Sequence, residues 1–324
     1  MVQQRKAPTT WWDYGFQDMP LPVFRMLIKK EFMKNAHIKD IRVIDRMVEE
    51  AKQSDAKSSV NEEEMKRFQQ LSADWLLEES SFKSLYSLNK LRVPWIVKAL
   101  STCNYKHGEA SYKYLQSLRP ESNSTVVYPL RGRRIVDVAC GGGILSVALA
   151  RLGACVSAID ASPEAVQSTK QVIDVLLKRN TVGSVTVQHS TVEDFAKEHA
   201  NNFDAVVASE VIEHVNNLDV FLKSCIDLGR NNALIFITTI NKTILSKIFA
   251  IHFAEDILRI VPSGVHDWAK FVKPNNLHEL FEKNSCRVCF THGLSYNPFT
   301  NKWTWCNNPA VNYAMMARKL DNFS

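Results

Sequence analysis

The segment between residues 135 and 152 constrains the fold more than any other part of the chain. Residues 135–139 form a short apolar run suited to a buried parallel strand, and Gly141, Gly142 and Gly143 follow almost directly. A stretch with helical character comes next, so a strand, a glycine turn and a helix are expected in that order. Because glycine lacks a Cβ, the backbone can turn sharply there and a ligand can approach it closely. Three of only 11 glycines in 324 residues stand at this turn, which indicates a ligand-binding loop.

Strand-like and helix-like segments alternate over the following part of the chain. Four further apolar runs are each predicted to be a strand: 155–160, 184–188, 204–209 and 233–239. Helical stretches separate them, and one begins with Pro163 directly after Ser162, which suits a capped helix start. Alternation of this kind over about 110 residues predicts an α/β fold with a Rossmann-like, doubly wound, mostly parallel sheet.

The two ends of the chain have a different character. Residues 286–290 and 311–317 look like strands without a good helix between them, so we expect an antiparallel C-terminal hairpin and a sheet of seven strands in all. Residues 1–70 are polar and predict a helical N-terminal extension. The α/β domain is therefore predicted to span 71–324.

Composition and charge limit the class of protein, its partners and its redox compartment. Hydrophobic residues make up 45% and charged residues 23%, as in soluble globular proteins. The net charge of +6 is not gathered into a run of like charges, so it does not demand nucleic acid and suits an anionic membrane surface equally well. No apolar run is long enough for a transmembrane helix. Seven scattered cysteines indicate a reducing compartment.

An acidic residue accompanies the glycine turn. Asp160 ends the second predicted strand, 17 residues after Gly143, where its carboxylate could accept hydrogen bonds from both hydroxyls of a ribose. A dinucleotide site would need a Gly-x-Gly-x-x-Gly pattern, and Ala139-Cys140-Gly-Gly-Gly matches it poorly. The sequence around the turn instead resembles motif I of the class I S-adenosylmethionine-dependent methyltransferases. In that family the loop wraps the methionine end of the cofactor and the acid after strand two holds its ribose.

A second group of polar residues follows the fourth predicted strand. If a helix begins there, Glu210, Glu213 and His214 share one face at spacings i, i+3 and i+4. Two carboxylates and an imidazole could hold Mg²⁺ or a similar divalent cation, which would acidify a catechol hydroxyl. Two other interpretations stay open: the histidine packs as a hydrogen-bond donor at the helix start, or His214 acts as a general base.

From about Trp75 to Lys319 the chain resembles the ubiquinone-biosynthesis O-methyltransferase family, and its animal mitochondrial form more than its bacterial one. Motif I alone would indicate only the superfamily. Three further segments carry the closer resemblance: the Asn-Lys-Leu-Arg stretch at 89–92, the Pro-Ser-Gly-Val-His stretch at 262–266 and the Tyr-Asn-Pro turn at 296–298. The family usually has glycine where Ala139 stands, a small change that should be tolerated.

The resemblance implies roles for particular residues. Five positions would contact S-adenosyl-L-methionine: Arg92, Ala139, Gly141, Asp160 and Ser209. The guanidinium of Arg92 could clamp the carboxylate of the cofactor's methionine moiety. Three positions would bind Mg²⁺ or a similar ion: Glu210, Glu213 and His214.

The resemblance also implies a substrate and a location. The substrates would be catechol-type hydroxyls of polyprenylated ubiquinone precursors, namely polyprenyl dihydroxybenzoate and demethylubiquinol. The enzyme would lie at the matrix face of the mitochondrial inner membrane as a peripheral protein, with partners in a biosynthetic complex. Residues 243–261 are amphipathic, and the insertion at 243–272 that contains them would cap the active site or face the membrane.

The first 55 residues of the N-terminal extension do not resemble that family. Residues 30–50 resemble a segment of a LYR-type accessory subunit of respiratory complex I, without the Leu-Tyr-Arg signature itself. An ordinary amphipathic helix is the alternative. This foreign segment raises a rival hypothesis, in which the chain is a non-catalytic scaffold of a mitochondrial biosynthetic or respiratory complex.

Overall fold

The computed structural model describes residues 82–101, 128–177, 181–241, 272–297 and 300–321. All of them belong to one compact unit, Ser58–Ser324. The predicted extension at 1–70, with its LYR-like segment, lies outside the described residues. So does the predicted cap at 243–272, apart from Val272.

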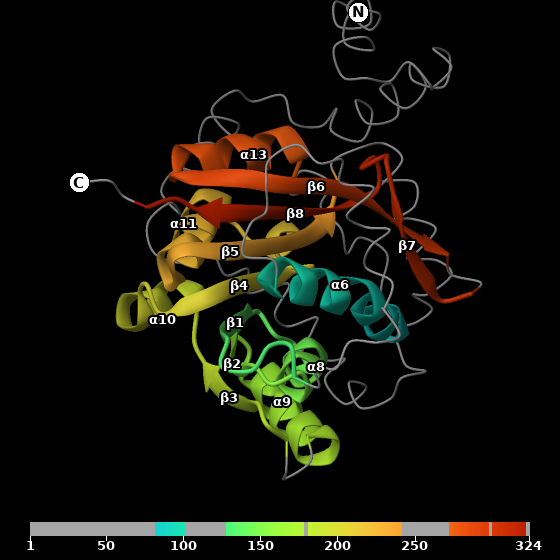
Figure 1. Cartoon of the computed structure of the whole chain (residues 1–324), viewed down its shortest axis with the longest axis vertical. Helices are drawn as coiled ribbons and strands as arrows, with labels where there is room; N and C mark the ends of the chain where they lie inside the picture. Colours follow the sequence, from blue (N-terminus) through green and yellow to red (C-terminus); the bar gives the residue numbers. More distant parts are fainter. Residues whose placement is uncertain (1–81, 102–127, 178–180, 242–271, 298–299, 322–324) are drawn as a thin grey trace, which may run out of the picture. The chain divides into compact units, whose positions relative to one another are not determined.

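Eight strands of the described chain form a single sheet (Figure 1). Their order across the sheet is β3-β2-β1-β4-β5-β8-β6-β7. The strands span β1 Arg134–Val138, β2 Cys155–Asp160, β3 Ser184–His189, β4 Phe203–Ser209, β5 Gly229–Ile240, β6 Cys286–Asn297, β7 Lys302–Cys306 and β8 Asn312–Lys319. Neighbours among β1 to β5 run parallel, whereas β8 is antiparallel to both β5 and β6. The predicted parallel sheet with an antiparallel C-terminal part is confirmed.

The sheet contains one strand more than the sequence predicts. β7 pairs antiparallel with β6 at the edge of the sheet, from Gly293 opposite Cys306 to Asn297 opposite Lys302. The predicted pair, β6 and β8, does form, but it is not a simple hairpin because β7 lies between them in the sequence. β7 is a five-residue strand at the edge of the sheet, and its pairing with β6 is a tertiary contact that the sequence prediction did not include.

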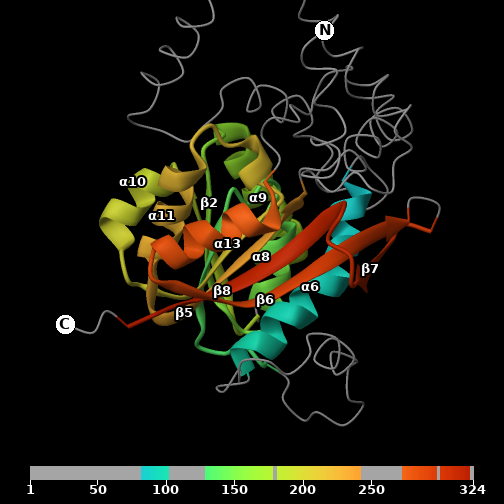
Figure 2. The ribbon, with the colours of Figure 1, turned by 90° about the horizontal axis from the view of Figure 1, so that it is seen from above.

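Helices cover both faces of the sheet (Figure 2). They span α6 Lys83–Ser101, α8 Ile144–Arg151, α9 Pro163–Leu176, α10 Val192–His199, α11 Leu218–Leu228 and α13 Pro274–Lys283. Apolar residues of α10, α11 and α13 form one buried cluster with the sheet, and those of α6 and α8 form another with its other face. This two-sided cover is what a near-continuous apolar strand such as β4 requires.

Local sequence explains where key helices begin and sit. α9 starts as predicted, since the Ser162 side chain accepts a hydrogen bond from the amide of Ala165 and Pro163 occupies the first turn. α6 packs through Trp95, whose ring meets that of Phe236 on β5 edge-on at 5.0 Å between centroids. In the described part of the chain, no helix combines the length and hydrophobicity needed to cross a membrane.

The topology gathers the predicted site residues. β1 lies between β2 and β4 and is parallel to both, so the carboxyl ends of these three strands meet at one edge of the sheet. Ala139, Asp160 and Ser209 stand at those ends. Open α/β sheets bind their ligands at this edge, where the strand order reverses.

Candidate active site

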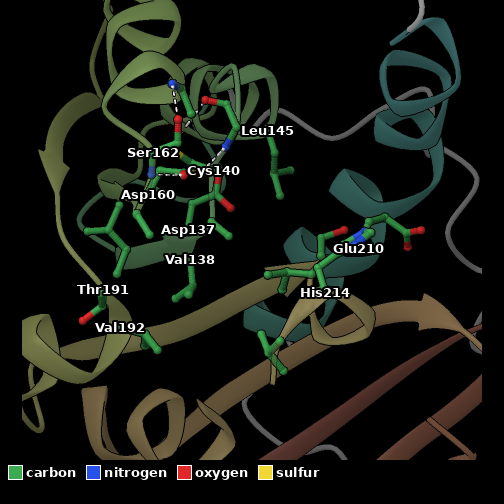
Figure 3. Close-up of a pocket in the computed structure, with 18 of the residues that line it drawn as sticks. Asp137, Val138, Cys140, Leu145, Asp160, Ser162, Thr191, Val192, Glu210 and His214 are labelled. Atoms are coloured by element: carbon green, nitrogen blue, oxygen red, sulfur yellow. Dashed lines mark hydrogen bonds between the residues drawn. The ribbon is translucent and has the colours of Figure 1, made fainter. Parts of the chain in front are cut away.

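One cavity opens at the carboxyl edge of the sheet (Figure 3). Residues from α6, from the turn after β1 and from the ends of β2, β3 and β4 line it. All five predicted cofactor residues are among them: Arg92, Ala139, Gly141, Asp160 and Ser209. The fold therefore brings together residues that are separated by up to 117 positions in the chain.

The glycine turn has a strained backbone. Ala139, Gly141 and Gly143 all have positive φ, at 55°, 55° and 72°. At Gly143 an added Cβ would lie 2.6 Å from Thr169 Cγ2, so the position needs glycine for its space as well as for its backbone angle. Ala139 adopts the left-handed conformation at a cost of roughly 1–2 kcal/mol. That cost explains why glycine is the residue expected at position 139.

Asp160 ties the turn to the end of β2. Its Oδ2 accepts a hydrogen bond from the Gly141 amide and its Oδ1 accepts one from the Ser162 amide, both at 2.9 Å. Burial raises the pKa of Asp160, and the two amide hydrogen bonds oppose that rise. Each carboxylate oxygen keeps a lone pair for a further donor. The residue therefore shapes the loop and can still receive hydroxyl groups in the cavity.

Arg92 reaches the cavity from α6 and is held from two sides. Its Nη1 donates to Ser209 Oγ and its Nε donates to Asn89 Oδ1, each at 2.7 Å. Burial lowers the pKa of Arg92 to about 10, opposed by the negative charges of Asp137 and Glu210. The guanidinium is only 5% exposed and remains charged at neutral pH, so it offers a fixed cation to an anionic ligand group.

The structure adds Asn89 to the residues that organise this cation. The Asn89 amide nitrogen donates to the carbonyl of Ile144, the first residue of α8, at 3.1 Å. One side chain thus links the Arg92 guanidinium to the helix that follows the glycine turn. The sequence prediction missed Asn89, although its position one helical turn before Arg92 was the available signal.

Asp137 is a second residue that the prediction missed. It is 3% exposed in β1, lines the cavity and accepts a hydrogen bond from Ser146 Oγ at 2.6 Å. Burial raises the pKa of Asp137 to about 6, opposed by the Ser146 hydrogen bond and the charge of Arg92. A carboxyl group inside an apolar strand was the signal in the sequence.

The cavity extends along the end of β3. Ser190, Thr191 and Val192 line it there, and the Thr191 side chain caps α10 by accepting from the Asp194 amide. No distinctive pattern marks these three residues in the sequence. They lie beside Asp160 because β3 is the parallel neighbour of β2.

The predicted helical face after β4 is wrong. Glu210 has a φ of 57°, its amide donates to the Thr238 carbonyl at 2.8 Å, and only a three-residue 3-10 turn, η2 Ile212–His214, follows. Glu210 and His214 line the cavity, but Glu213 is not among its lining residues. Figure 3 shows Glu210 and His214 across the cavity from Asp160. The three residues do not share one helical face because the chain is not yet helical at Glu210.

The buried carboxyl group of Glu210 is only partly hydrogen-bonded. Its Oε1 is buried and has no hydrogen-bond partner among the described residues. Burial, and secondarily the charge of Glu213, raises the pKa of Glu210 to about 7. Within the described ranges, no group of three or more His, Cys, Asp or Glu side chains is arranged to hold a metal ion.

Comparison with known proteins decides the family. A family model described as a methyltransferase domain matches residues 111–291. The mitochondrial ubiquinone biosynthesis O-methyltransferase of Rattus norvegicus is 39% identical over 262 residues, which cover 80% of this chain and 70% of that protein. The corresponding protein of Colwellia psychrerythraea is 35% identical over 262 residues, covering 81% of this chain and 98% of that one. The chain belongs to the ubiquinone-biosynthesis O-methyltransferase family.

This assignment confirms the predicted family, and with it an S-adenosylmethionine-dependent methyltransferase activity. The rival hypothesis of a non-catalytic scaffold is not favoured. A solved structure of a SAM-dependent methyltransferase from Methanosarcina mazei aligns with a TM-score of 0.45 at 17% identity, covering 60% of this methyltransferase and 95% of that chain.

Proposed function

We propose that this methyltransferase moves a methyl group from S-adenosylmethionine to a catechol-type hydroxyl of a polyprenylated ubiquinone precursor. Polyprenyl dihydroxybenzoate and demethylubiquinol are the substrates we propose. The names of the relatives support the pathway. The observation that carries the proposal is one cavity that joins the glycine turn, Asp160 and Arg92 to Glu210 and His214.

The cofactor would occupy the half of the cavity formed by α6, β1 and β2. The Asp160 carboxylate would accept the ribose hydroxyls, and the Arg92 guanidinium would pair with the carboxylate of the methionine moiety. Ala139 and Gly141 would lie against the methionine chain, since both line the cavity and neither has a side chain larger than a methyl group. Ser209 would act through Arg92, whose Nη1 it holds.

Methyl transfer requires little covalent chemistry from the protein. A phenolic oxygen attacks the methyl carbon, the carbon–sulfur bond breaks as the carbon–oxygen bond forms, and the sulfonium becomes a neutral thioether. The hydroxyl proton must leave, and we propose the imidazole of His214, which lines the cavity, as its acceptor. Most of the rate enhancement would come from holding the two reactants in line.

The predicted Mg²⁺ set does not fit the donor atoms of the described residues. A bound divalent cation would supply charge that acidifies the catechol hydroxyl. Glu210 and His214 line the cavity, but Glu213 accepts a hydrogen bond from Thr239 Oγ1 at 2.7 Å and is 4% exposed. The proposed steps therefore use protein groups alone.

We further propose a mitochondrial location, at the matrix face of the inner membrane, with peripheral membrane contact and partners in a biosynthetic complex. The relatives from Rattus norvegicus and Homo sapiens are named as mitochondrial, which supports the organelle. A net charge of +6 is compatible with an anionic lipid surface. Residues 243–272 stay the predicted cap or membrane-facing segment.

Labelled S-adenosylmethionine and a prenylated dihydroxybenzoate test the proposed activity. Transfer of label to the ring hydroxyl is expected, and Asp160→Ala should abolish most of it by weakening cofactor binding. Asp174→Asn, an exposed acid on α9, is the matched control and should transfer normally. Absence of transfer with any divalent cation supplied would refute the O-methyltransferase proposal. A reaction that stops on addition of EDTA and resumes with Mg²⁺ would contradict the metal-free steps alone.

A further inference from the structure

Glu213 stands apart from the two residues with which the sequence groups it. Glu210 and His214 line the cavity, whereas Glu213 does not appear among the described lining residues and is 4% exposed. A buried carboxylate is costly unless its oxygens receive hydrogen bonds. The partners of Glu213 therefore indicate what the residue does.

The contacts of Glu213 belong to the core beneath the site. Its Oε2 accepts a hydrogen bond at 2.7 Å from the hydroxyl of Thr239, a fully buried residue of β5. Thr239 pairs across the sheet with Tyr313 of β8, and the charge of Glu213 adds to the burial that raises the pKa of Tyr313. Since both neighbours are buried on interior strands of the sheet, the carboxylate anchors η2 to the core.

Two consecutive threonines hold the two ends of the segment after β4. The Thr238 carbonyl accepts from the Glu210 amide at 2.8 Å, and the Thr238 hydroxyl lies 2.6 Å from Ser209 Oγ. Side chains of successive strand residues point to opposite faces, so the hydroxyl of Thr239 lies on the other face of β5 from that of Thr238. It instead reaches Glu213.

The hydrogen bond between Glu213 and Thr239 lies close to a residue with a strained backbone. Glu210 adopts a φ of 57°, a conformation that residues other than glycine keep only when the surroundings fix it. Ser209 is held on one side of Glu210, and Glu213 on the other. Release of the Glu213 anchor would let the strained residue relax and would shift His214 in the cavity.

We propose that Glu213 is a positioning residue rather than a metal ligand: by pinning η2 to Thr239 it keeps Glu210 and His214 at the cavity. The proposal builds on the proposed methyl transfer, because it assigns the supporting element of that reaction site. It predicts that an uncharged hydrogen-bond acceptor at position 213 is sufficient to hold η2 to Thr239 and to keep the activity. A metal ligand, in contrast, would require the carboxylate.

Two substitutions separate these roles. Glu213→Gln keeps an oxygen that can accept from Thr239, and we expect kcat and the thermal midpoint close to those of the parent. Thr239→Val removes the donor with little change of shape and leaves all carboxylates in place. We expect it to lower kcat about tenfold, the size of one hydrogen bond, with the KM for S-adenosylmethionine nearly unchanged. Thr186→Val, an exposed threonine of β3, is the matched control.

Binding measurements make the test independent of turnover. Mn²⁺ binding, followed by the electron paramagnetic resonance of the free ion, should be the same for the parent, Glu213→Gln and Thr239→Val. Weaker Mn²⁺ binding by Glu213→Gln alone would overturn the proposal, as would a normal kcat for Thr239→Val. Thermal unfolding of Glu213→Ala, which removes the acceptor, of Thr239→Val and of their double variant adds a coupling measurement. Additive losses in this cycle would show that the two side chains do not act together.

These outcomes differ from a failure of the proposed function. If the parent transfers no methyl group, the O-methyltransferase proposal fails, while the unfolding coupling between Glu213 and Thr239 still reports on the anchor.

Discussion

Replacement of Gly143 by alanine should damage the cofactor loop through two separable effects. The first is the backbone: a φ of 72° costs a residue with a Cβ roughly 1–2 kcal/mol. The second is space, because the new Cβ would lie 2.6 Å from Thr169 Cγ2, well inside the normal carbon–carbon contact of about 3.5–4.0 Å. Relief of such a contact by local shifts costs about 1–3 kcal/mol. We therefore expect Gly143→Ala to lower the free energy of unfolding by about 3 kcal/mol.

A matched pair of variants isolates the two effects. Gly132 has a φ of 79°, and no heavy atom of the described residues lies within 4 Å of its ideal Cβ position. Gly132→Ala should therefore show the backbone cost alone, about 1 kcal/mol. Thr169→Ser removes the clashing methyl group and can keep the hydrogen bond that Thr169 Oγ1 donates to the Gly141 carbonyl at 2.6 Å. Adding Thr169→Ser to Gly143→Ala should recover part of the lost stability.

Urea unfolding of the ligand-free protein measures the stabilities, and titration calorimetry with S-adenosylhomocysteine measures the loop. Gly143→Ala should bind this product weakly even under conditions where it is folded, whereas Gly132→Ala should bind normally. Equal unfolding free energies for the two alanine variants would refute the steric argument. So would a Thr169→Ser addition that recovers nothing.

Three further predictions concern the same cavity. Asn89→Ala should raise the KM for S-adenosylmethionine several-fold with kcat nearly unchanged, because Arg92 loses an orienting acceptor. Lys90→Ala, on the exposed side of α6, is the control. Equal effects of the two substitutions on this KM would contradict the role of Asn89. Asp137 has a folded-state pKa of about 6 against an ordinary 3.8, so folding favours its protonated form. The stabilisation that protonated Asp137 gives the folded state is therefore full below pH 4 and is lost as the pH rises through 6. Asp137→Asn should remove that loss and stabilise the ligand-free protein at pH 8 by up to roughly 3 kcal/mol in urea unfolding; a less stable variant would refute the sign. Ala139→Gly should raise the free energy of unfolding by about 1 kcal/mol, since it relieves a left-handed alanine, and a lower thermal midpoint would contradict this.

The part of the site that sequence alone predicts is the part built by neighbouring residues. The turn after β1 and Asp160 at the end of β2 belong to a single strand–turn–helix–strand unit, so spacing was enough to place them together. Arg92 meets Ser209 across 117 residues, and no local pattern contains that contact. Only the family resemblance pointed to it. Asn89 shows the limit of that route, because its role depends on the carbonyl of Ile144.

The wrong prediction after β4 has a similar cause. The spacing of Glu210, Glu213 and His214 is helical, but the backbone at Glu210 is fixed by the Thr238 carbonyl on the neighbouring strand. That hydrogen bond is a tertiary contact and leaves no trace in local periodicity. For the same reason β7 escaped prediction: five residues become a strand because β6 offers them an edge.

The position of β8 has a consequence for synthesis of the chain. β8 lies between β5 and β6, although it is made after both. On the ribosome, β1 to β5 can assemble in order as each emerges, but the β6–β7 pair gains its strand connection to them only when Lys319 has left the exit tunnel. A nascent chain released after Cys306 would expose two open sheet edges, β5 and β6, each rich in apolar side chains. The strand formed by Asn312–Lys319 therefore determines whether the newly made protein has one continuous sheet or exposes two unpaired edges to chaperones.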